Sequence, residues 1–141
     1  MAEVHKQVVA PPHSAEAEQG VLGCVLQDNR AFDVAGTMLD AEAMYVYEHR
    51  CVWAAIRTLV IAHKPADVLT VFEVLRTREE AEAVGGLAFL NDLAQCVPSS
   101  AHVKAYAEVV AFNAQRRKVM QLAADVGKLA AREAVAPDVF R

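Results

Sequence analysis

The sequence contains little glycine, proline or aromatic side chain: 6 glycines, 5 prolines and 6% aromatic residues among its 141 residues. Hydrophobic residues make up 55% and charged residues 23%, a composition that excludes collagen-like, disordered and low-complexity chains. Abundant alanine and scarce aromatic residues favour helices over sheets. A compact chain of this length buries roughly 68–70% of its extended surface, so we expect an all-α fold whose core needs no disulfide or metal.

Paired cysteines and an excess of positive charge are also missing. Cys24, Cys51 and Cys96 form no Cys-x-x-Cys motif and are interpreted as reduced, buried thiols. The formal net charge is −4 at pH 7, whereas a generic nucleic-acid-binding domain is basic. The opening residues are too polar for a signal peptide, and no uncharged apolar run reaches roughly 18 residues. We therefore expect an intracellular protein without a membrane segment.

Apolar spacing and capping residues predict a globular bundle of five short helices over residues 13–99, after a flexible lead-in at 1–12. Ser14 caps the first helix, and Asp28-Asn29 caps the second. Thr70, with Glu73 three residues later, is predicted to open the fourth helix as a capping box. The five helices are expected at about 15–27, 30–39, 48–63, 70–76 and 87–97.

The proline-free stretch 100–134 predicts one long helix. About 34 residues at 1.5 Å each extend roughly 50 Å, whereas a compact domain of this chain length is about 37 Å across. Part of the helix must therefore project. One apolar face includes Tyr106 and Val110 and is expected to pack on the bundle, and a second face, turned by about a third of a revolution, includes Leu122 and Val126. A kink, or two separate helices, would produce the same pattern, and the sequence leaves that choice open.

Motifs that carry catalysis are absent from the sequence. The only Gly-Lys pair, Gly127-Lys128, lacks the first glycine and the hydroxyl residue of a phosphate loop. His49 and Cys51 have no further ligands at metal-site spacing and are interpreted as a helix-start histidine and a buried thiol. The carboxylates of 79–82 are interpreted as a solvated face. The basic stretch 116–118 is interpreted as a solvated helix face or a partner contact rather than a nucleic-acid site.

The stretch from Pro12 to Gly23, with Ser14, Glu16-Ala17-Glu18-Gln19 and Val21-Leu22-Gly23, resembles the start of the DnaB-type replicative DNA helicases of bacteria and their phages. Further family-like positions follow in the same order, so that the resemblance covers roughly residues 11–130. They are His49, Ala55-Ile56, Leu59, Pro65-Ala66-Asp67, Thr70, Leu75, Gly85-Gly86, Phe89-Leu90, Leu93, Pro98-Ser99, Tyr106-Ala107, Val110 and Arg116-Arg117.

The resemblance is to the N-terminal domain of that family, which implies a collar domain that associates as a trimer of dimers within a hexamer. It also implies docking of the helicase-binding domain of primase and of a helicase loader, in the cytoplasm of a bacterial or phage-infected cell. ATP, Mg and DNA would engage the ATPase domain and the full-length hexamer, and no catalysis or cofactor is expected in this chain. The long helix resembles the first arm of a helical hairpin, with residues 135–141 as a linker or the truncated start of the second arm.

The candidate interface lies on the outward side of the long helix. Its side chains could instead pack within the arm itself. A standalone helical DNA-binding regulator that uses residues 115–118 is the alternative function, and an independent enzyme is a third hypothesis with almost no motif support. The proposed interface residues are Val109, Phe112, Arg116, Val119, Leu122, Val126 and Leu129.

Overall fold

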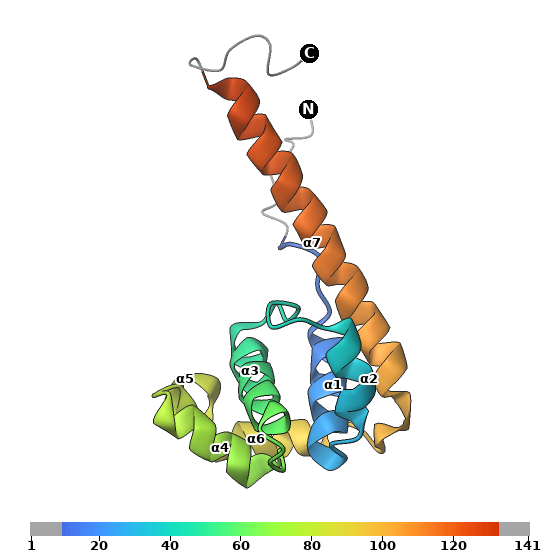
Figure 1. The fold of residues 1–141 in the computed structure, drawn as a ribbon, viewed down its shortest axis with the longest axis vertical. Coiled ribbons are helices and arrows are strands. Elements are labelled where there is room, and N and C mark those ends of the chain that lie inside the picture. Colours follow the sequence, from blue (N-terminus) through green and yellow to red (C-terminus); the bar gives the residue numbers. More distant parts are fainter. Residues whose placement is uncertain (1–9, 133–141) are drawn as a thin grey trace, which may run out of the picture.

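The computed structural model describes residues 10–132, and within this range every regular element is a helix. The predicted all-α fold, a bundle of short helices followed by one long helix, is confirmed (Figure 1), although within these residues the bundle has six short helices where five were expected. The bundle contains α1 (Ala15–Gln27), α2 (Ala31–Met38), α3 (Tyr47–Ile61), α4 (Val68–Thr77), α5 (Ala81–Val84) and α6 (Gly86–Gln95). A 3-10 turn, η1 (Ser100–His102), leads into α7 (Val103–Ala131).

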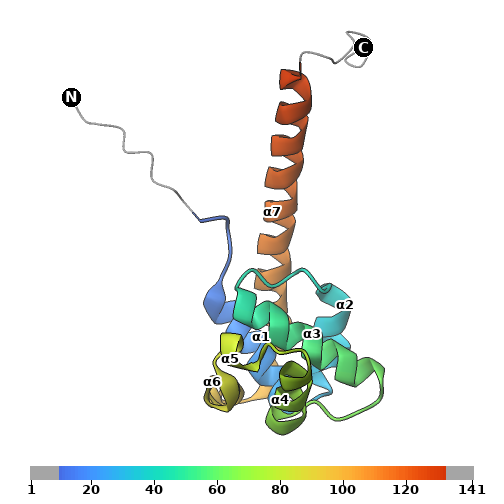
Figure 2. The ribbon, with the colours of Figure 1, turned by 90° about the vertical axis from the view of Figure 1, so that its left-hand side faces the viewer.

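The first helix lies at the centre of the bundle. It packs against α3, α6 and the lower part of α7, while α4 lies against α3 and α6. Two views at right angles show α7 rising out of the bundle, with its upper part away from every other helix (Figures 1 and 2). The core is formed mainly by α1 and α3, where Leu22, Trp53 and Ile56 are fully buried. The indole N–H of Trp53 donates a hydrogen bond to the Asp40 carbonyl at 3.0 Å.

Two glycines of α1 allow close packing of other elements. A Cβ at Gly23 would lie 2.6 Å from the backbone oxygen of Leu93, so α6 approaches the α1 backbone directly. A Cβ at Gly20 would lie 2.7 Å from the ring of Tyr106, so there the close neighbour is a side chain of α7. Both positions therefore exclude a larger residue unless the neighbouring element shifts.

The fourth helix begins earlier than the sequence predicts. Its N-cap is Asp67, which accepts a hydrogen bond from the Thr70 N–H at 2.9 Å, while Thr70 Oγ1 accepts one from the Asp67 N–H at 2.8 Å. Thr70 is thus the second member of a reciprocal capping box, not its first. The predicted box of Thr70 with Glu73 is therefore wrong: the box lies three residues earlier, where Asp67 opens the helix and Thr70 takes the place expected for Glu73.

The predicted second cap also has a different role in the structure. The side-chain amide of Asn29 donates to the carbonyls of Val25 and Ala66 and accepts from the Ala66 N–H, all within 2.8–2.9 Å. It ties the end of α1 to the segment before α4, and α2 begins after Arg30 without a side-chain cap. Tertiary hydrogen bonds therefore replace the expected local cap.

The last helix is one continuous element of 29 residues, or about 43 Å at 1.5 Å per residue. This resolves the open choice between a single helix, a kink and two helices. Its lower part buries Val103, Ala107, Val110 and Ala114, close to the predicted packing face. From residue 118 to 131 every side chain is exposed. No helix within residues 10–132 is long and apolar enough to cross a membrane.

Candidate interaction surface on the long helix

The exposed upper part of α7, residues 118–131, carries apolar side chains that the chain itself does not cover. We call this part the distal arm. Leu122 is 64% exposed and Val126 is 54% exposed. Six residues before the distal arm, Phe112 is 63% exposed. Exposed apolar groups of this size, arranged in a row, are typical of a binding surface rather than of a free monomer surface.

The exposed apolar residues follow a heptad spacing. Phe112, Val119 and Val126 are each seven residues apart, and Leu122 and Leu129 repeat at the same interval, three residues after Val119 and Val126. This is the a/d pattern by which one helix packs along another. We call these five residues the seam. Small side chains at 123 and 130 adjoin the seam and allow close approach of a partner helix.

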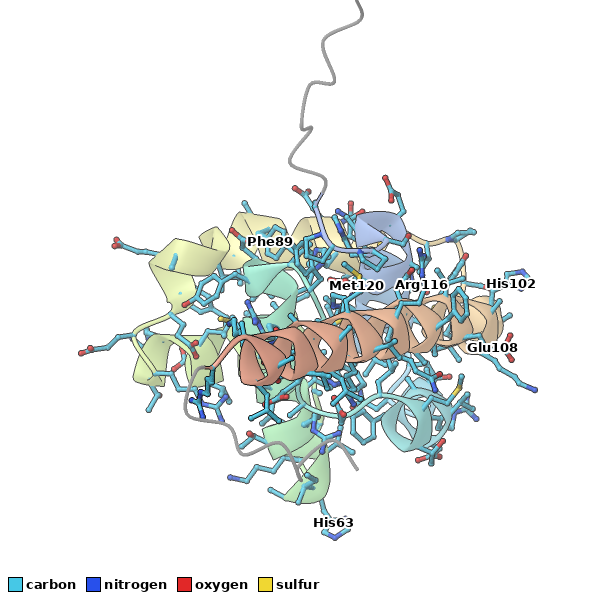
Figure 3. The ribbon with its side chains drawn as sticks, turned by 90° about the horizontal axis from the view of Figure 1, so that it is seen from above. His63, Phe89, His102, Glu108, Arg116 and Met120 are labelled. Atoms are coloured by element: carbon cyan, nitrogen blue, oxygen red, sulfur yellow. The ribbon has the colours of Figure 1, made fainter. Side chains whose placement is uncertain are left out.

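Val109 and Arg116 complete the predicted interface but lie beside the seam. Val109 is 43% exposed and precedes the seam by one turn. The Arg116 guanidinium carbon lies 5.7 Å from the Phe112 ring centre, where the cation can interact with the ring face. Met120, which sequence reasoning missed, is also exposed. It lines a shallow hollow together with Phe112, Arg116 and Val119. Figure 3 shows Arg116 and Met120 on the same side of α7.

The basic stretch 116–118 is divided between the surface and the bundle. Arg117 is partly buried and donates hydrogen bonds of 2.8 Å to the carbonyls of Pro12 and Ala43. Lys118 forms an ion pair of 3.0 Å with Asp40. Only Arg116 therefore matches the interpretation of this stretch as a solvated face or partner contact, because Arg117 and Lys118 contact the bundle of their own chain. Residues 115–118 therefore present little free positive charge to the phosphates of a nucleic acid.

A buried hydrogen bond between Glu18 and His49 joins α1 to α3 next to this point. Glu18, which is 1% exposed, accepts hydrogen bonds from the Tyr45 N–H at 3.0 Å and the Val46 N–H at 3.2 Å. His49 Nδ1 lies 3.0 Å from the same carboxylate and donates to it. Burial raises the pKa of Glu18, but these three hydrogen bonds together outweigh burial, so the pKa lies below its ordinary value of 4.5.

The expectations for the other candidate residues meet mixed outcomes. Cys24 and Cys51 are buried as expected, whereas Cys96 is exposed, which corrects the expectation of three buried thiols. Glu80 is not purely solvated, because it accepts a hydrogen bond from Cys51 Sγ at 3.1 Å. Within residues 10–132, no three His, Cys, Asp or Glu side chains are grouped closely enough to hold a metal ion.

A sequence model of the DnaB-like helicase N terminal domain matches residues 10–112, which include the whole bundle and the lower part of α7. The chain belongs to this family. The resemblance noted in the sequence is thereby confirmed, and the comparison of structures agrees with it. The N-terminal domain of DnaB helicase from Mycobacterium tuberculosis, known from a crystal structure, matches with a TM-score of 0.85 and 31% identity over 90% of each chain.

The chain is also similar in sequence to much longer proteins. Replicative DNA helicase DnaB of Pasteurella multocida is 35% identical over 87% of this chain and 26% of that protein. Replicative DNA helicase DnaB of Treponema pallidum is 37% identical over 80% of this chain and 26% of its own length. The chain thus spans about a quarter of the length of the curated relatives that it matches.

Within this DnaB-like domain, the residues that hold the fold together were not recognised as functional in the sequence. Glu18 was noted as part of the family-like stretch Glu16-Ala17-Glu18-Gln19, and Arg117 as part of the family-like pair Arg116-Arg117 and of a basic stretch. Their partners, Tyr45 and Ala43, lie in a segment without a periodic pattern. The one available signal was the pairing of two family-like positions, Glu18 and His49, which the structure brings into contact.

Proposed function

We propose that this chain is the N-terminal collar domain of a replicative DNA helicase. It would self-associate as dimers within a hexamer through the seam and the adjoining face, and would dock primase or a helicase loader during DNA replication. No catalysis is assigned to these residues; ATP, Mg and DNA would be handled by the ATPase part and by the full-length hexamer. The site of action would be the cytoplasm of a bacterial or phage-infected cell.

The observation that carries the proposal is the uncovered seam on α7. Burying a valine, leucine or phenylalanine side chain contributes roughly 1.5–3 kcal/mol, so the five seam residues offer on the order of 10 kcal/mol before the costs of association. Those costs are of similar size, at about 4–15 kcal/mol. One pair of arms would therefore associate weakly, and a stable collar would need a further helix or several repeated contacts.

The charge distribution favours a partner that is both apolar and acidic. Residues 103–132 carry six basic and two acidic side chains, whereas residues 10–102 carry six basic and thirteen acidic ones. The net charge of −4 therefore conceals a basic segment, residues 103–132, on an acidic bundle. Arg116 flanks the seam with its charge in solvent, so carboxylates beside the apolar face of a partner helix would pair with it.

Analytical ultracentrifugation of the 141-residue chain, alone and with the helicase-binding fragment of the cognate primase, tests the proposal. Leu122→Ser and Val126→Ser together should weaken self-association or primase binding at least tenfold, which corresponds to about 1.4 kcal/mol. The matched control is Ile61→Ser, because Ile61 is 67% exposed on α3, away from the arm. A strict monomer that ignores primase at micromolar concentrations, or equal effects of the seam and control variants, would refute the proposal.

A further inference from the structure

The direction of the distal arm is set mainly below residue 118, because every side chain from 118 to 131 is exposed, including that of Lys118, whose ion pair with Asp40 lies in solvent. The packing of α7 on the bundle uses small side chains at its upper end. Val110 is the last large buried residue, and beyond it only Ala114 is buried. Small apolar side chains allow two helices to approach closely. They interdigitate little with the opposite helix, however, and therefore resist tilting of one helix against the other only weakly.

Arg117 is the last residue of α7 that the bundle holds firmly. Its two guanidinium nitrogens bond to separate chain segments, namely Pro12 in the lead-in and Ala43 in the segment between α2 and α3, each at 2.8 Å. The guanidinium also lies 5.3 Å from the Tyr45 ring centre. The His13 ring packs on the same tyrosine at 4.2 Å between centres. One side chain thus joins three parts of the chain that are remote in sequence.

Tyr45 is itself held in place by a buried residue of α1. Its backbone N–H donates to the buried Glu18 carboxylate, which belongs to α1. The contacts therefore form a continuous path from the core, through Tyr45, to Arg117 and the base of the arm. The ion pair of Lys118 with Asp40 lies nearby, but both side chains are more than half exposed, and such pairs contribute about 0–1 kcal/mol.

We propose that Arg117 is a positioning residue that fixes the direction in which the arm leaves the bundle, by clamping the lead-in and the segment between α2 and α3 against α7. The lead-in residues 11–13 are then part of the base of the arm. This inference deepens the proposed function, because the direction of the arm matters only if seams must meet a partner. Ala131 lies fourteen residues beyond Arg117, or about 21 Å. A tilt of roughly 20° moves the tip by about 7 Å, close to the full spacing between packed helices of about 8–10 Å.

Residual dipolar couplings of the backbone amides in the 141-residue chain measure this direction without a partner. In the unchanged protein, one alignment tensor should fit the amides of the bundle and of residues 118–131. In Arg117→Ala, the couplings of the arm should fall at least twofold relative to those of the bundle. Arg117→Lys should behave similarly, because lysine keeps the charge but cannot bridge two carbonyls in the fixed geometry of a guanidinium.

Two controls separate positioning from loss of charge. Arg116→Ala removes a neighbouring positive charge that is exposed, and Lys118→Ala removes the ion pair with Asp40. Both should leave a single tensor. The amide spectrum of the bundle reports whether Arg117→Ala still folds, and if it does not, Arg117→Lys alone decides. A single tensor in a folded Arg117 variant would overturn the inference, and so would an equal loss in Arg116→Ala.

The outcome is independent of the test of the proposed function. The couplings are measured at concentrations where sedimentation shows a monomer, so they report the free chain. If Arg117→Ala loosens the arm but seam variants do not affect association, the clamp stands and the collar proposal fails. If seam variants act as expected but the arm direction survives in both Arg117 variants, the clamp fails alone.

Discussion

Replacing Glu18 with glutamine removes a buried negative charge and keeps the size of the side chain. The carboxylate uses both oxygens: Oε1 accepts from Val46 and His49, and Oε2 accepts from Tyr45. Glutamine has one acceptor oxygen and places an N–H₂ group at the other position. That group faces a hydrogen-bond donor whichever way the amide is turned, so at least one buried donor loses its acceptor.

The expected cost follows from these contacts. A hydrogen bond to a charged group contributes roughly 1.5–3 kcal/mol, and an unpaired buried donor costs about 1–3 kcal/mol. The remaining bonds become neutral and weaker. We expect a loss of about 3 kcal/mol in the free energy of unfolding, or roughly 12 °C in Tm for a domain of this size. This is a large share of the total stability of about 5–15 kcal/mol that is usual for a domain.

Urea unfolding followed by the fluorescence of Trp53, the single and fully buried tryptophan, measures this loss. Glu16→Gln is the matched control, because Glu16 is in the same first turn of α1 but is exposed. It should lose no more than about 0.3–1 kcal/mol, the usual contribution of a charge near a helix end. If Glu18→Gln is no less stable than Glu16→Gln, the buried carboxylate does not hold the segment between α2 and α3 as argued.

Three further predictions follow from pKa shifts and glycine packing. Folding lowers the pKa of Glu18. Its contribution to the free energy of unfolding is therefore complete above pH 4.5 and is lost as the pH falls through the pKa of the folded state. In Glu18→Gln, the urea midpoint should consequently decrease less steeply with falling pH than in the unchanged protein. Gly127→Ala, whose Cβ would meet nothing within 4 Å, should stabilise the distal arm by about 0.5–1 kcal/mol and so slow its amide exchange. Gly23→Ala should lower Tm, because its Cβ would clash with α6. Effects of the same sign in the two variants would contradict this interpretation of the glycine packing. Burial, with a smaller contribution from Cys96, raises the pKa of the Cys24 thiol to about 11, and burial also raises the pKa of Cys96. Because Cys96 is exposed and Cys24 is buried, iodoacetamide should modify Cys96 first, as peptide mass mapping can check.

The helices could be predicted because their signals are local. Ser14 caps α1 as expected, accepting a hydrogen bond from the Ala17 N–H at 3.1 Å, and the apolar period of α3 places Trp53 and Ile56 in the core. The errors arose where a local signal had two interpretations. Asn29 was expected to cap α2 because asparagine often does so, yet its amide bonds to Ala66, which is 37 residues away.

The seam could also be predicted, because exposed apolar residues on a helix repeat at a fixed interval. The clamp at Arg117 could not. Its acceptors are the carbonyls of Pro12 and Ala43, and a backbone carbonyl has no signature in the sequence. Glu18 presents the same difficulty, since two of its three partners are backbone N–H groups.

The sequence by itself determined the class of fold, the projection of the terminal helical segment beyond the bundle and the apolar stripe that this segment carries, because capping and periodicity act over a few residues and depend on side-chain identity. Only the tertiary structure decided that the helix is continuous, that Glu18 is a buried anchor rather than a surface charge, and that Arg117 belongs to the bundle while Arg116 belongs to solvent. These outcomes depend on which distant backbone groups come within hydrogen-bond distance, and only the packing of the whole chain fixes that.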